Sequence, residues 1–344
     1  MQTIAFYDTK PYDRIYFDQY AKELDFDIHY LEYKLNPETA YAAKGCKAVV
    51  AFVNDDISGK TIDALYKRGV EIIGMRCAGY NNIDFKHAYE KLHIVRVPEY
   101  SPHAVAEHTM GLLLTLNRKI HRAYNRTREY NFSLNSLIGF DLYGKTIGVA
   151  GTGKIGRAFI DVCRGFGMHI LAYDPYPADI PDVTYVDFDT LCKQSDIISL
   201  HCPLTKDTKY LINEDSINKM KDGVFILNTS RGALIDSEAL LAGLKSLKIG
   251  AAGLDVYEEE TDLFYEDLSY TIINDDVLAG LISMPNVIVT SHQAFLTHEA
   301  LNNIARITLN NLRSYFDGHA LENEICYRCS KGEECKKDHA KRCF

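Results

Sequence analysis

Gly151-Thr-Gly-Lys-Ile-Gly156 is the stretch that decides the fold. It follows the apolar run 146–150 and opens a helical segment, and a second apolar run, 169–173, ends at Asp174. An apolar strand that enters G-x-G-x-x-G, followed by a helix and a second strand ending in an acidic residue, is typical of a βαβ dinucleotide-binding unit. The glycine motif alone would fit an ordinary turn before a helix, but strand, helix, strand and Asp174 in register favour a nucleotide site.

Each part of this unit has a physical role. Gly151 permits the tight turn, Gly153 lets the backbone approach a pyrophosphate, and Gly156 lets the helix pack closely on the strand. The N–H groups of the first helical turn face the phosphate charge. Asp174 lies 18 residues after Gly156, where a carboxylate can accept both ribose hydroxyls of NAD and repel the extra phosphate of NADP.

The composition is that of an ordinary globular protein. The chain has 344 residues, enough for two domains, with 47% hydrophobic and 25% charged residues. Its 38 basic and 47 acidic residues give a net charge of -9, which argues against nucleic acid or an anionic membrane as a partner. The start of the chain lacks a signal-peptide pattern, and apolar runs such as 110–114 are too short to span a bilayer. We therefore expect a cytoplasmic protein.

The order of apolar runs and helical patterns predicts the fold class. We expect α/β architecture with two doubly wound parallel-sheet domains of the Rossmann-like or flavodoxin-like kind. In the first 99 residues the predicted strands are 3–7, 47–53, 71–75 and 93–97, and the predicted helices are 13–24 and 60–68. After residue 145 the predicted strands are 146–150, 169–173, 196–200, 224–228, 250–255 and 287–290, and 296–316 is a closing helix.

A single long helix is predicted from His103 to about Tyr130. Its first half is apolar well beyond one stripe, and its second half is basic. A helix with so much apolar surface must be covered. The sequence does not distinguish between two ways of covering this surface: contact with a second subunit, or burial between the two domains.

Candidate catalytic side chains follow the strands of the second half, where ligand residues of doubly wound sheets lie. Arg231 carries a planar fork suited to a carboxylate or a ketone oxygen. His292 can donate a proton near neutral pH, and a glutamate from the run 258–260 would favour its protonated form. Together they suit the reduction of a 2-oxo acid by hydride, although Arg231 could be a surface ion pair, the glutamates a solvated run and His292 an ordinary histidine.

The motifs assembled in order resemble the D-isomer-specific 2-hydroxyacid dehydrogenase family, and within it the fermentative bacterial D-lactate dehydrogenases. The resemblance covers about residues 3–325. Besides the glycine motif it rests on Phe52-Val-Asn-Asp-Asp56, Arg76-Cys-Ala-Gly-Tyr-Asn-Asn82, Val97-Pro-Glu-Tyr-Ser-Pro102, His201-Cys-Pro-Leu-Thr205, Asn228-Thr-Ser-Arg-Gly-Ala-Leu-Ile-Asp236, Gly253-Leu-Asp-Val-Tyr-Glu258 and His292-Gln-Ala-Phe-Leu-Thr297. On the residues alone, the loops that begin at Phe52 and Arg76 could be ordinary βα turns.

The resemblance implies a role for each site residue. Arg231 would bind substrate and act in catalysis, His292 would be the acid/base and Glu260 its partner. The implied NAD contacts, beside the three glycines, are Lys154, Ile155, Asp174, Cys202, Pro203, Thr208, Thr229, Ser230, Arg231 and Asp255. Ala78 and Gly79 would hold the substrate carboxylate, and Phe52, Tyr100 and Phe295 would wall its side-chain pocket, with Arg231 and His292 also at the substrate. No metal is implied.

The resemblance also implies an architecture. Residues 1–99 and 298–325 would form a discontinuous substrate domain and residues 100–297 the NAD domain, with the active site in the cleft between them. The helix 103–130 would lie at a homodimer or higher-oligomer interface. The implied reaction is the reversible reduction of pyruvate to D-lactate; the alternatives are a bulkier 2-oxo acid, such as 2-oxoisocaproate or phenylpyruvate, and a non-catalytic NAD sensor.

The chain departs from the family at its end, residues 326–344. Five of its nine cysteines are scattered, as in reduced cytosolic proteins, but the tail carries Cys326, Cys329, Cys335 and Cys343, with His339 among them. The ligand types suit zinc or an iron–sulfur cluster, but the spacing fits no standard pattern. The tail is interpreted as a flexible basic segment with exposed thiols, with a metal site or a redox-sensitive disulfide as alternatives.

Overall fold

A computed structural model describes residues 1–258, 264–265, 267–330 and 343. The chain forms two compact units. Unit 1 comprises Met1–Ser101 and Leu296–Phe344, and unit 2 comprises Pro102–Phe295. The limits predicted from the sequence, 1–99 with 298–325 and 100–297, differ from these boundaries by two residues. Within the described residues, no helix has the length and apolar character needed to cross a membrane.

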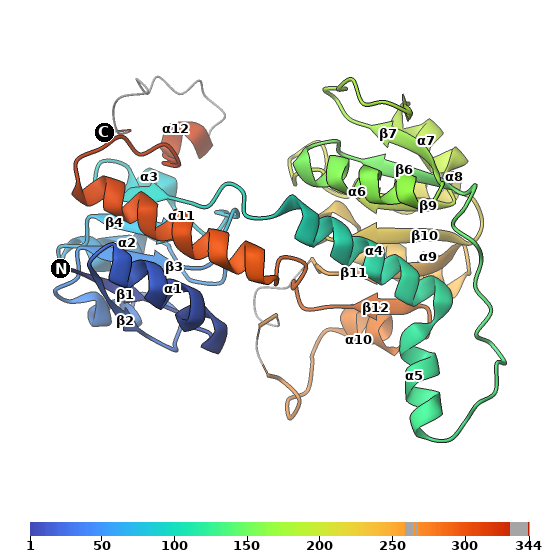
Figure 1. The fold of residues 1–344 in the computed structure, drawn as a ribbon, viewed down its shortest axis with the longest axis horizontal. Helices are drawn as coiled ribbons and strands as arrows, with labels where there is room; N and C mark the ends of the chain where they lie inside the picture. Colours follow the sequence, from blue (N-terminus) through green and yellow to red (C-terminus); the bar gives the residue numbers. More distant parts are fainter. Residues whose placement is uncertain (259–263, 266, 331–342, 344) are drawn as a thin grey trace. The chain divides into compact units, whose positions relative to one another are not determined.

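Unit 1 is a five-stranded parallel sheet in the order β2-β1-β3-β4-β5. Its strands are β1 (Gln2–Phe6), β2 (Phe26–Tyr30), β3 (Ala48–Ala51), β4 (Ile72–Met75) and β5 (His93–Val95). Its helices are α1 (Pro11–Glu23), η1 (Thr39–Ala43), α2 (Gly59–Tyr66), α3 (Phe85–Ala88), α11 (His298–Phe316) and α12 (Tyr327–Ser330). Helices α1 and α11 lie side by side on this unit (Figure 1).

The core of unit 1 follows from strand periodicity. Side chains alternate between the faces of a strand, so Val49 and Ile73 join one cluster with residues of η1, α2 and α3. The opposite face takes α11, where Leu312 lies 3.2 Å from the position that a Cβ on Gly74 would occupy. Apolar residues on both faces explain why β3 and β4 read as short continuous apolar runs.

Unit 2 is a seven-stranded parallel sheet in the order β12-β11-β10-β9-β6-β7-β8. Its strands are β6 (Thr146–Ala150), β7 (His169–Tyr173), β8 (Val183–Tyr185), β9 (Ile197–Leu200), β10 (Val224–Asn228), β11 (Ile249–Leu254) and β12 (Val287–Val289). Its helices are α4 (Pro102–Arg118), α5 (Ile120–Arg128), α6 (Lys154–Gly165), α7 (Phe188–Gln194), α8 (Glu214–Lys219), η2 (Gly232–Leu234), α9 (Ser237–Lys245) and α10 (Asp276–Ser283). The order reverses between β6 and β9, the position where doubly wound sheets bind ligands.

The predicted helix 103–130 is wrong in its continuity. Helix α4 ends at Arg118, Lys119 has a φ of +51°, and α5 begins at Ile120. Two hydrogen bonds explain the break, because the Asn117 side chain donates to the Phe140 carbonyl oxygen at 2.7 Å and accepts from its N–H at 2.9 Å. The apolar half, α4, packs with α6 in the core of unit 2, whereas α5 has no buried residue.

The tail prediction is also wrong for its first thiol. Ile325 donates its N–H to the Ile94 carbonyl oxygen at 2.9 Å, and Cys326 is buried directly after it. Cys343 is half-buried, and its N–H donates to a Glu324 carboxylate oxygen at 2.6 Å. Cys335 and His339 lie outside the described residues, so the metal and disulfide interpretations stay predictions.

Candidate active site

The glycine turn of unit 2 is built as the motif requires. Gly151 has a φ of +98°, and its N–H donates to the Tyr173 carbonyl oxygen at 2.8 Å. A Cβ on Gly151 would lie 2.6 Å from the Cys202 nitrogen, and one on Gly156 would lie 2.1 Å from the Gly151 oxygen. Gly153, the N-cap of α6, has nothing within 4 Å of an added Cβ. Gly151 and Gly156 are therefore needed for close packing, whereas Gly153 faces open space where a pyrophosphate can approach.

Asp174 ties the end of β7 to this turn. Its Oδ2 accepts hydrogen bonds from the N–H and hydroxyl of Thr152 at 2.7 and 2.9 Å, and its Oδ1 accepts from the Tyr176 N–H at 2.9 Å. Partial burial raises the Asp174 pKa, but these hydrogen bonds and the charge of Arg157 outweigh it, so the pKa lies below its usual value. The carboxylate remains ionised and has lone pairs left for ribose hydroxyls.

The remaining predicted cofactor residues form a hydrogen-bonded rim beside the turn. The Ser230 hydroxyl donates to the Cys202 carbonyl oxygen at 2.7 Å, and the Thr208 hydroxyl donates to the Pro203 carbonyl oxygen at 2.6 Å. The Thr229 and Thr109 hydroxyls lie 2.8 Å apart. Lys154 and Ile155 form the first turn of α6. These residues thus come together at the carboxyl ends of β6, β9 and β10.

Arg231 follows β10 and is half-buried. The Asn228 side chain donates to the Arg231 carbonyl oxygen at 2.8 Å, and the Arg231 Nη1 donates to the Ser230 carbonyl oxygen at 2.7 Å. Gly232 fixes the next position, because a Cβ there would lie 2.0 Å from the Tyr257 backbone. The turn therefore holds the guanidinium at the strand end.

Asp255 holds the backbone at His292. Both Asp255 and His292 follow neighbouring strands, β11 and β12, and the His292 N–H donates to the Asp255 carbonyl oxygen at 2.8 Å. The fully buried Asp255 carboxylate also accepts from the Thr290 hydroxyl at 2.6 Å and from the N–H groups of Gln293 and Ala294 at 2.9 and 2.8 Å. His292 itself has a φ of +54°. Asp255 therefore holds the backbone of the segment that carries His292, a role that the sequence did not predict; its predicted NAD contact stays a prediction.

His108 completes this network and was missed by sequence reasoning. It lies within α4, and its Nε2 is 3.4 Å from the Asp255 Oδ1 and 3.2 Å from the Thr290 hydroxyl. Burial raises the Asp255 pKa, but the hydrogen bonds from His108, Thr290 and the two backbone N–H groups outweigh it and lower the pKa. The sequence offered no signal, because His108 and Asp255 are far apart in the chain.

His201 packs against the core of unit 2 and makes no hydrogen bond with the network at His292 among the described residues. Its Nε2 lies 2.9 Å from the Ser199 hydroxyl, and its ring packs on Phe159. Burial lowers the His201 pKa to about 3, so the ring is neutral. Glu260, the predicted partner of His292, lies outside the described residues. The neighbouring Glu258 carboxylate accepts a hydrogen bond from the Tyr210 hydroxyl.

The predicted substrate residues divide between the units. In unit 1, Phe52 and Ala78-Gly79 follow β3 and β4, and the Ala78 carbonyl oxygen accepts from Arg96 Nη1 at 2.8 Å. The Tyr100 carbonyl oxygen accepts from the Asn303 amide at 2.8 Å. In unit 2, Phe295 is buried three residues after His292.

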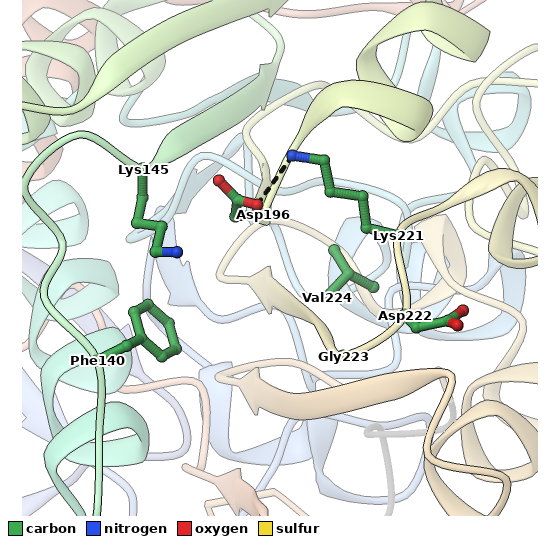
Figure 2. Close-up of a pocket in the computed structure, with 7 residues that line it drawn as sticks. All are labelled: Phe140, Lys145, Asp196, Lys221, Asp222, Gly223 and Val224. Atoms are coloured by element: carbon green, nitrogen blue, oxygen red, sulfur yellow. Dashed lines mark hydrogen bonds and ion pairs between the residues drawn. The ribbon is translucent and has the colours of Figure 1, made fainter.

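A separate cavity of about 220 Å³ lies at the amino ends of β6, β9 and β10 (Figure 2). Its charged side chains have partners: Lys221 pairs with Asp196 at 2.8 Å, and the Lys145 ammonium lies 5.6 Å from the centre of the Phe140 ring. Of the described residues that line it, none is a predicted site residue. The candidate site therefore lies at the opposite end of the strands, at their carboxyl ends.

The hydrogen-bonding groups at the carboxyl ends of these strands fit a dinucleotide. The open face of Gly153 and the first turn of α6 suit a pyrophosphate, and the ionised Asp174 suits a ribose.

Comparisons with known proteins identify the family of this chain. Residues 110–294 match the model of the NAD-binding domain of the D-isomer specific 2-hydroxyacid dehydrogenases. The chain is 52% identical over 326 residues to D-lactate dehydrogenase of Escherichia coli strain K12, covering 94% of this chain and 99% of that one. The apo structure of the Escherichia coli enzyme aligns with a TM-score of 0.87 at 49% identity, covering 94% and 100% of the two chains. A structure of the pyruvate reductase of Chlamydomonas reinhardtii aligns with a TM-score of 0.90 at 41% identity, covering 94% and 98%. The chain belongs to the D-isomer specific 2-hydroxyacid dehydrogenase family.

Proposed function

We propose that the protein is an NAD-dependent D-lactate dehydrogenase that reduces pyruvate reversibly. The observation that carries the proposal is the chain of hydrogen bonds across three neighbouring strand ends. The Asp255 N–H donates to Asn228, whose side chain holds Arg231, and the Asp255 carbonyl oxygen accepts from His292. The backbone segments that carry Arg231 and His292 are thus joined at the carboxyl ends of the strands, in the sheet that also carries the glycine turn.

Arg231 has two tasks in this proposal. Its fork would grip the substrate carboxylate and polarise the ketone, so that negative charge developing on the ketone oxygen is stabilised. Bound NADH would supply the hydride. Replacing Arg231 by lysine keeps the charge but loses the fork, so the proposal expects a large loss of turnover.

His292 would give a proton to the new alkoxide oxygen, and in the reverse direction the neutral ring would take it back. Glu260 would favour the protonated ring. Its assignment rests on the family resemblance. The Tyr265 ring stacks near His292 with the ring centres 6.0 Å apart, and its hydroxyl donates to the His292 carbonyl oxygen at 3.2 Å, which supports a fixed orientation of the segment.

The substrate pocket is proposed to be small. Phe52, Tyr100 and Phe295 would place three aromatic rings around the substituent on the substrate ketone, and the backbone at Ala78-Gly79 would hold the carboxylate. A methyl group fits such a pocket better than a branched or aromatic group.

The sequence predicted a homodimer or higher homo-oligomer through residues 103–130. Because α4 packs in the core of unit 2 and α5 has no buried residue, we propose that the interface is formed by an arm made of α5 and residues 130–143. The arm carries large apolar side chains that are exposed, namely Tyr124, Tyr130, Phe132, Leu134, Ile138 and Tyr143. It has a defined shape, since Arg126 Nη1 donates to the Asn135 carbonyl oxygen at 2.7 Å. An ordered apolar projection of this kind suits a second copy. Leu134→Asp with Ile138→Asp should yield monomers in sedimentation velocity, and unchanged association would contradict the arm.

A substrate panel tests the function. Purified protein and NADH should turn over pyruvate with a kcat/KM well above that for 2-oxoisocaproate or phenylpyruvate. A preference for the larger acids would favour the alternative dehydrogenase. NADH binding without oxidation by any of these acids would instead indicate a non-catalytic NAD sensor. The cytoplasmic location remains a prediction of the sequence.

A further inference from the structure

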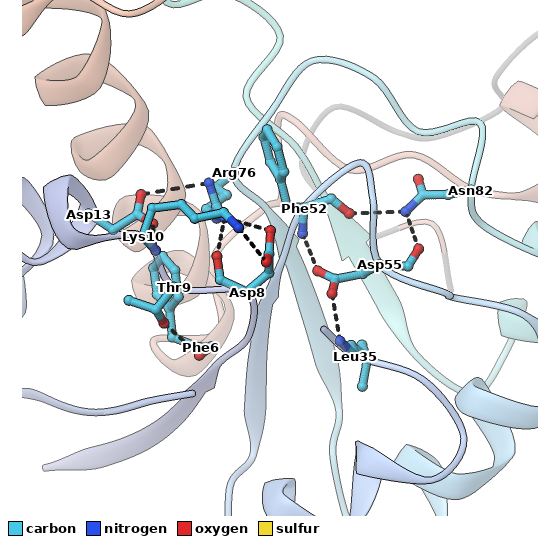
Figure 3. Close-up of polar contacts among 10 residues, drawn as sticks. All are labelled: Phe6, Asp8, Thr9, Lys10, Asp13, Leu35, Phe52, Asp55, Arg76 and Asn82. Atoms are coloured by element: carbon cyan, nitrogen blue, oxygen red, sulfur yellow. Dashed lines mark hydrogen bonds and ion pairs between the residues drawn. The ribbon is translucent and has the colours of Figure 1, made fainter. Parts of the chain in front are cut away.

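A buried polar cluster lies at the carboxyl ends of three neighbouring strands of unit 1 (Figure 3). Asp8 follows β1, the loop from Phe52 to Asp55 follows β3, and Arg76 follows β4. In parallel sheets this is the edge where ligand loops gather. Only Phe52 in this cluster has an implied role toward the substrate, so the charged residues around it need a physical explanation.

Arg76 supports the Phe52 ring. Its side chain is only 3% exposed, and its Cζ lies 4.1 Å from the centre of that ring. The guanidinium is anchored on the far side, because Nη2 donates to the Asp8 carbonyl oxygen at 2.8 Å. The carboxylates of Asp8 and Asp13 lie 3.7 and 3.6 Å from its two Nη atoms. The planar group is thus clamped against the aromatic face.

Asp55 and Asn82 fix the backbone of the same residue. The Asp55 Oδ2 accepts from the Phe52 N–H at 2.6 Å, and its Oδ1 accepts from the Leu35 N–H at 2.6 Å. The Asn82 amide donates to the carbonyl oxygens of Phe52 and Asp55 at 3.0 and 2.8 Å. Phe52 is therefore held at its N–H, at its carbonyl and at its ring face.

This construction is expensive for a purely structural purpose. Burying an arginine and three carboxylates is unfavourable unless geometry and pairing are good, and an apolar cluster of similar volume would often be as stable. What the polar cluster adds is directional restraint. Hydrogen bonds to the Phe52 backbone and a planar cation against its ring restrain the position and orientation of the ring.

We infer that Arg76, Asp55 and Asn82 are positioning residues that hold the Phe52 ring in place and thereby limit the size of the 2-oxo acid side chain that the enzyme accepts. The inference rests on the proposed function, in which Phe52 walls the substrate pocket. If the Phe52 ring cannot change its orientation, 2-oxo acids with larger side chains are excluded. If the ring is free to move, they can enter. The three residues act through Phe52 and do not touch the reacting atoms.

Two variants test this inference. Asn82→Ala removes two hydrogen bonds without leaving a buried charge, and Arg76→Lys keeps the charge but loses the plane and the fork. Asp63→Asn and Arg68→Lys are matched controls on the surface of unit 1. In the wild type the Asp63 carboxylate pairs with Lys91, and Arg68 donates to the Ala64 carbonyl oxygen. For each protein, kcat/KM is measured with pyruvate and with phenylpyruvate, together with the NADH dissociation constant and the thermal midpoint.

The expected result is a rise of about tenfold in the ratio of kcat/KM for phenylpyruvate to that for pyruvate, since a change in pocket size shifts such ratios by 10- to 200-fold. NADH affinity should not change, and the controls should keep the wild-type ratio. A lower thermal midpoint with an unaltered ratio would mean that the cluster is only structural and would overturn the inference. If Arg76→Lys does not fold, Asn82→Ala decides alone. A wild-type protein that reduces neither acid would instead refute the proposed function.

Discussion

Alanine at Gly153 should separate cofactor binding from folding. An added Cβ meets nothing within 4 Å, and the residue has φ -64° and ψ -170°, which any residue adopts. The free energy of unfolding should therefore change by less than about 1 kcal/mol, the small effects of lost glycine entropy and of an alanine N-cap opposing each other.

The same methyl group should interfere with NADH. It would occupy the open face through which a pyrophosphate reaches the first turn of α6. Losing one charge-assisted hydrogen bond costs about 2 kcal/mol, so the dissociation constant for NADH should rise by about 30-fold. Calorimetric titration with NADH, beside urea unfolding of the free protein, measures both quantities.

Gly156→Ala is the matched control, because its Cβ would lie 2.1 Å from the Gly151 oxygen. The backbone would have to move by about 1 Å, and overpacking of this kind costs roughly 1–3 kcal/mol of stability or more. We expect Gly156→Ala to lower the urea midpoint and Gly153→Ala to leave it unchanged. Wild-type NADH affinity in Gly153→Ala would refute the placement of the pyrophosphate at this turn.

Three further outcomes follow from the site and its supports. His292→Gln should reduce kcat by about 100-fold or more while NADH affinity is retained, because the proton donor is lost; equal losses in stopped-flow turnover and in NADH titration would make the histidine structural. Asp174→Ala should raise kcat/KM with NADPH relative to NADH, since the ionised carboxylate no longer repels the extra phosphate; an unchanged ratio would remove Asp174 from the ribose site. Burial raises the Asp55 pKa from 3.8 to about 7, so its contribution to stability is present below about pH 4 and is lost as the pH rises through about 7. Asp55→Asn should therefore gain stability relative to the wild type by about 2 kcal/mol between about pH 5 and pH 8 in urea titrations, and a constant difference would contradict the raised pKa.

Much of the fold could be predicted because its strands are local apolar runs. The glycine turn, β6, β7 and β10 were placed from the sequence with their limits, since each run is bounded by turn residues. Two strands were missed, β2 and β8. β2 alternates with polar residues, as in Phe26-Asp-Ile-His-Tyr30, and β8 has only three residues, so neither resembles a buried strand. Both lie at sheet edges.

Contacts between distant segments could not be predicted. Nothing near Lys119 marks the end of a helix, and the break depends on Asn117 pairing with the returning backbone at Phe140. In the site, the residue types at strand ends could be found from their order in the chain. The support that Asp255 and His108 give to the segment at His292 required the folded sheet and α4 together.

The most direct test of the account follows the hydride itself. Purified protein, pyruvate and NADH carrying deuterium at both C4 positions of the nicotinamide are incubated, and the lactate is analysed by chiral chromatography with mass spectrometry. The expected product is D-lactate with one deuterium on C2, formed in step with NADH oxidation. L-lactate, or lactate without deuterium on C2, would contradict the proposed hydride transfer.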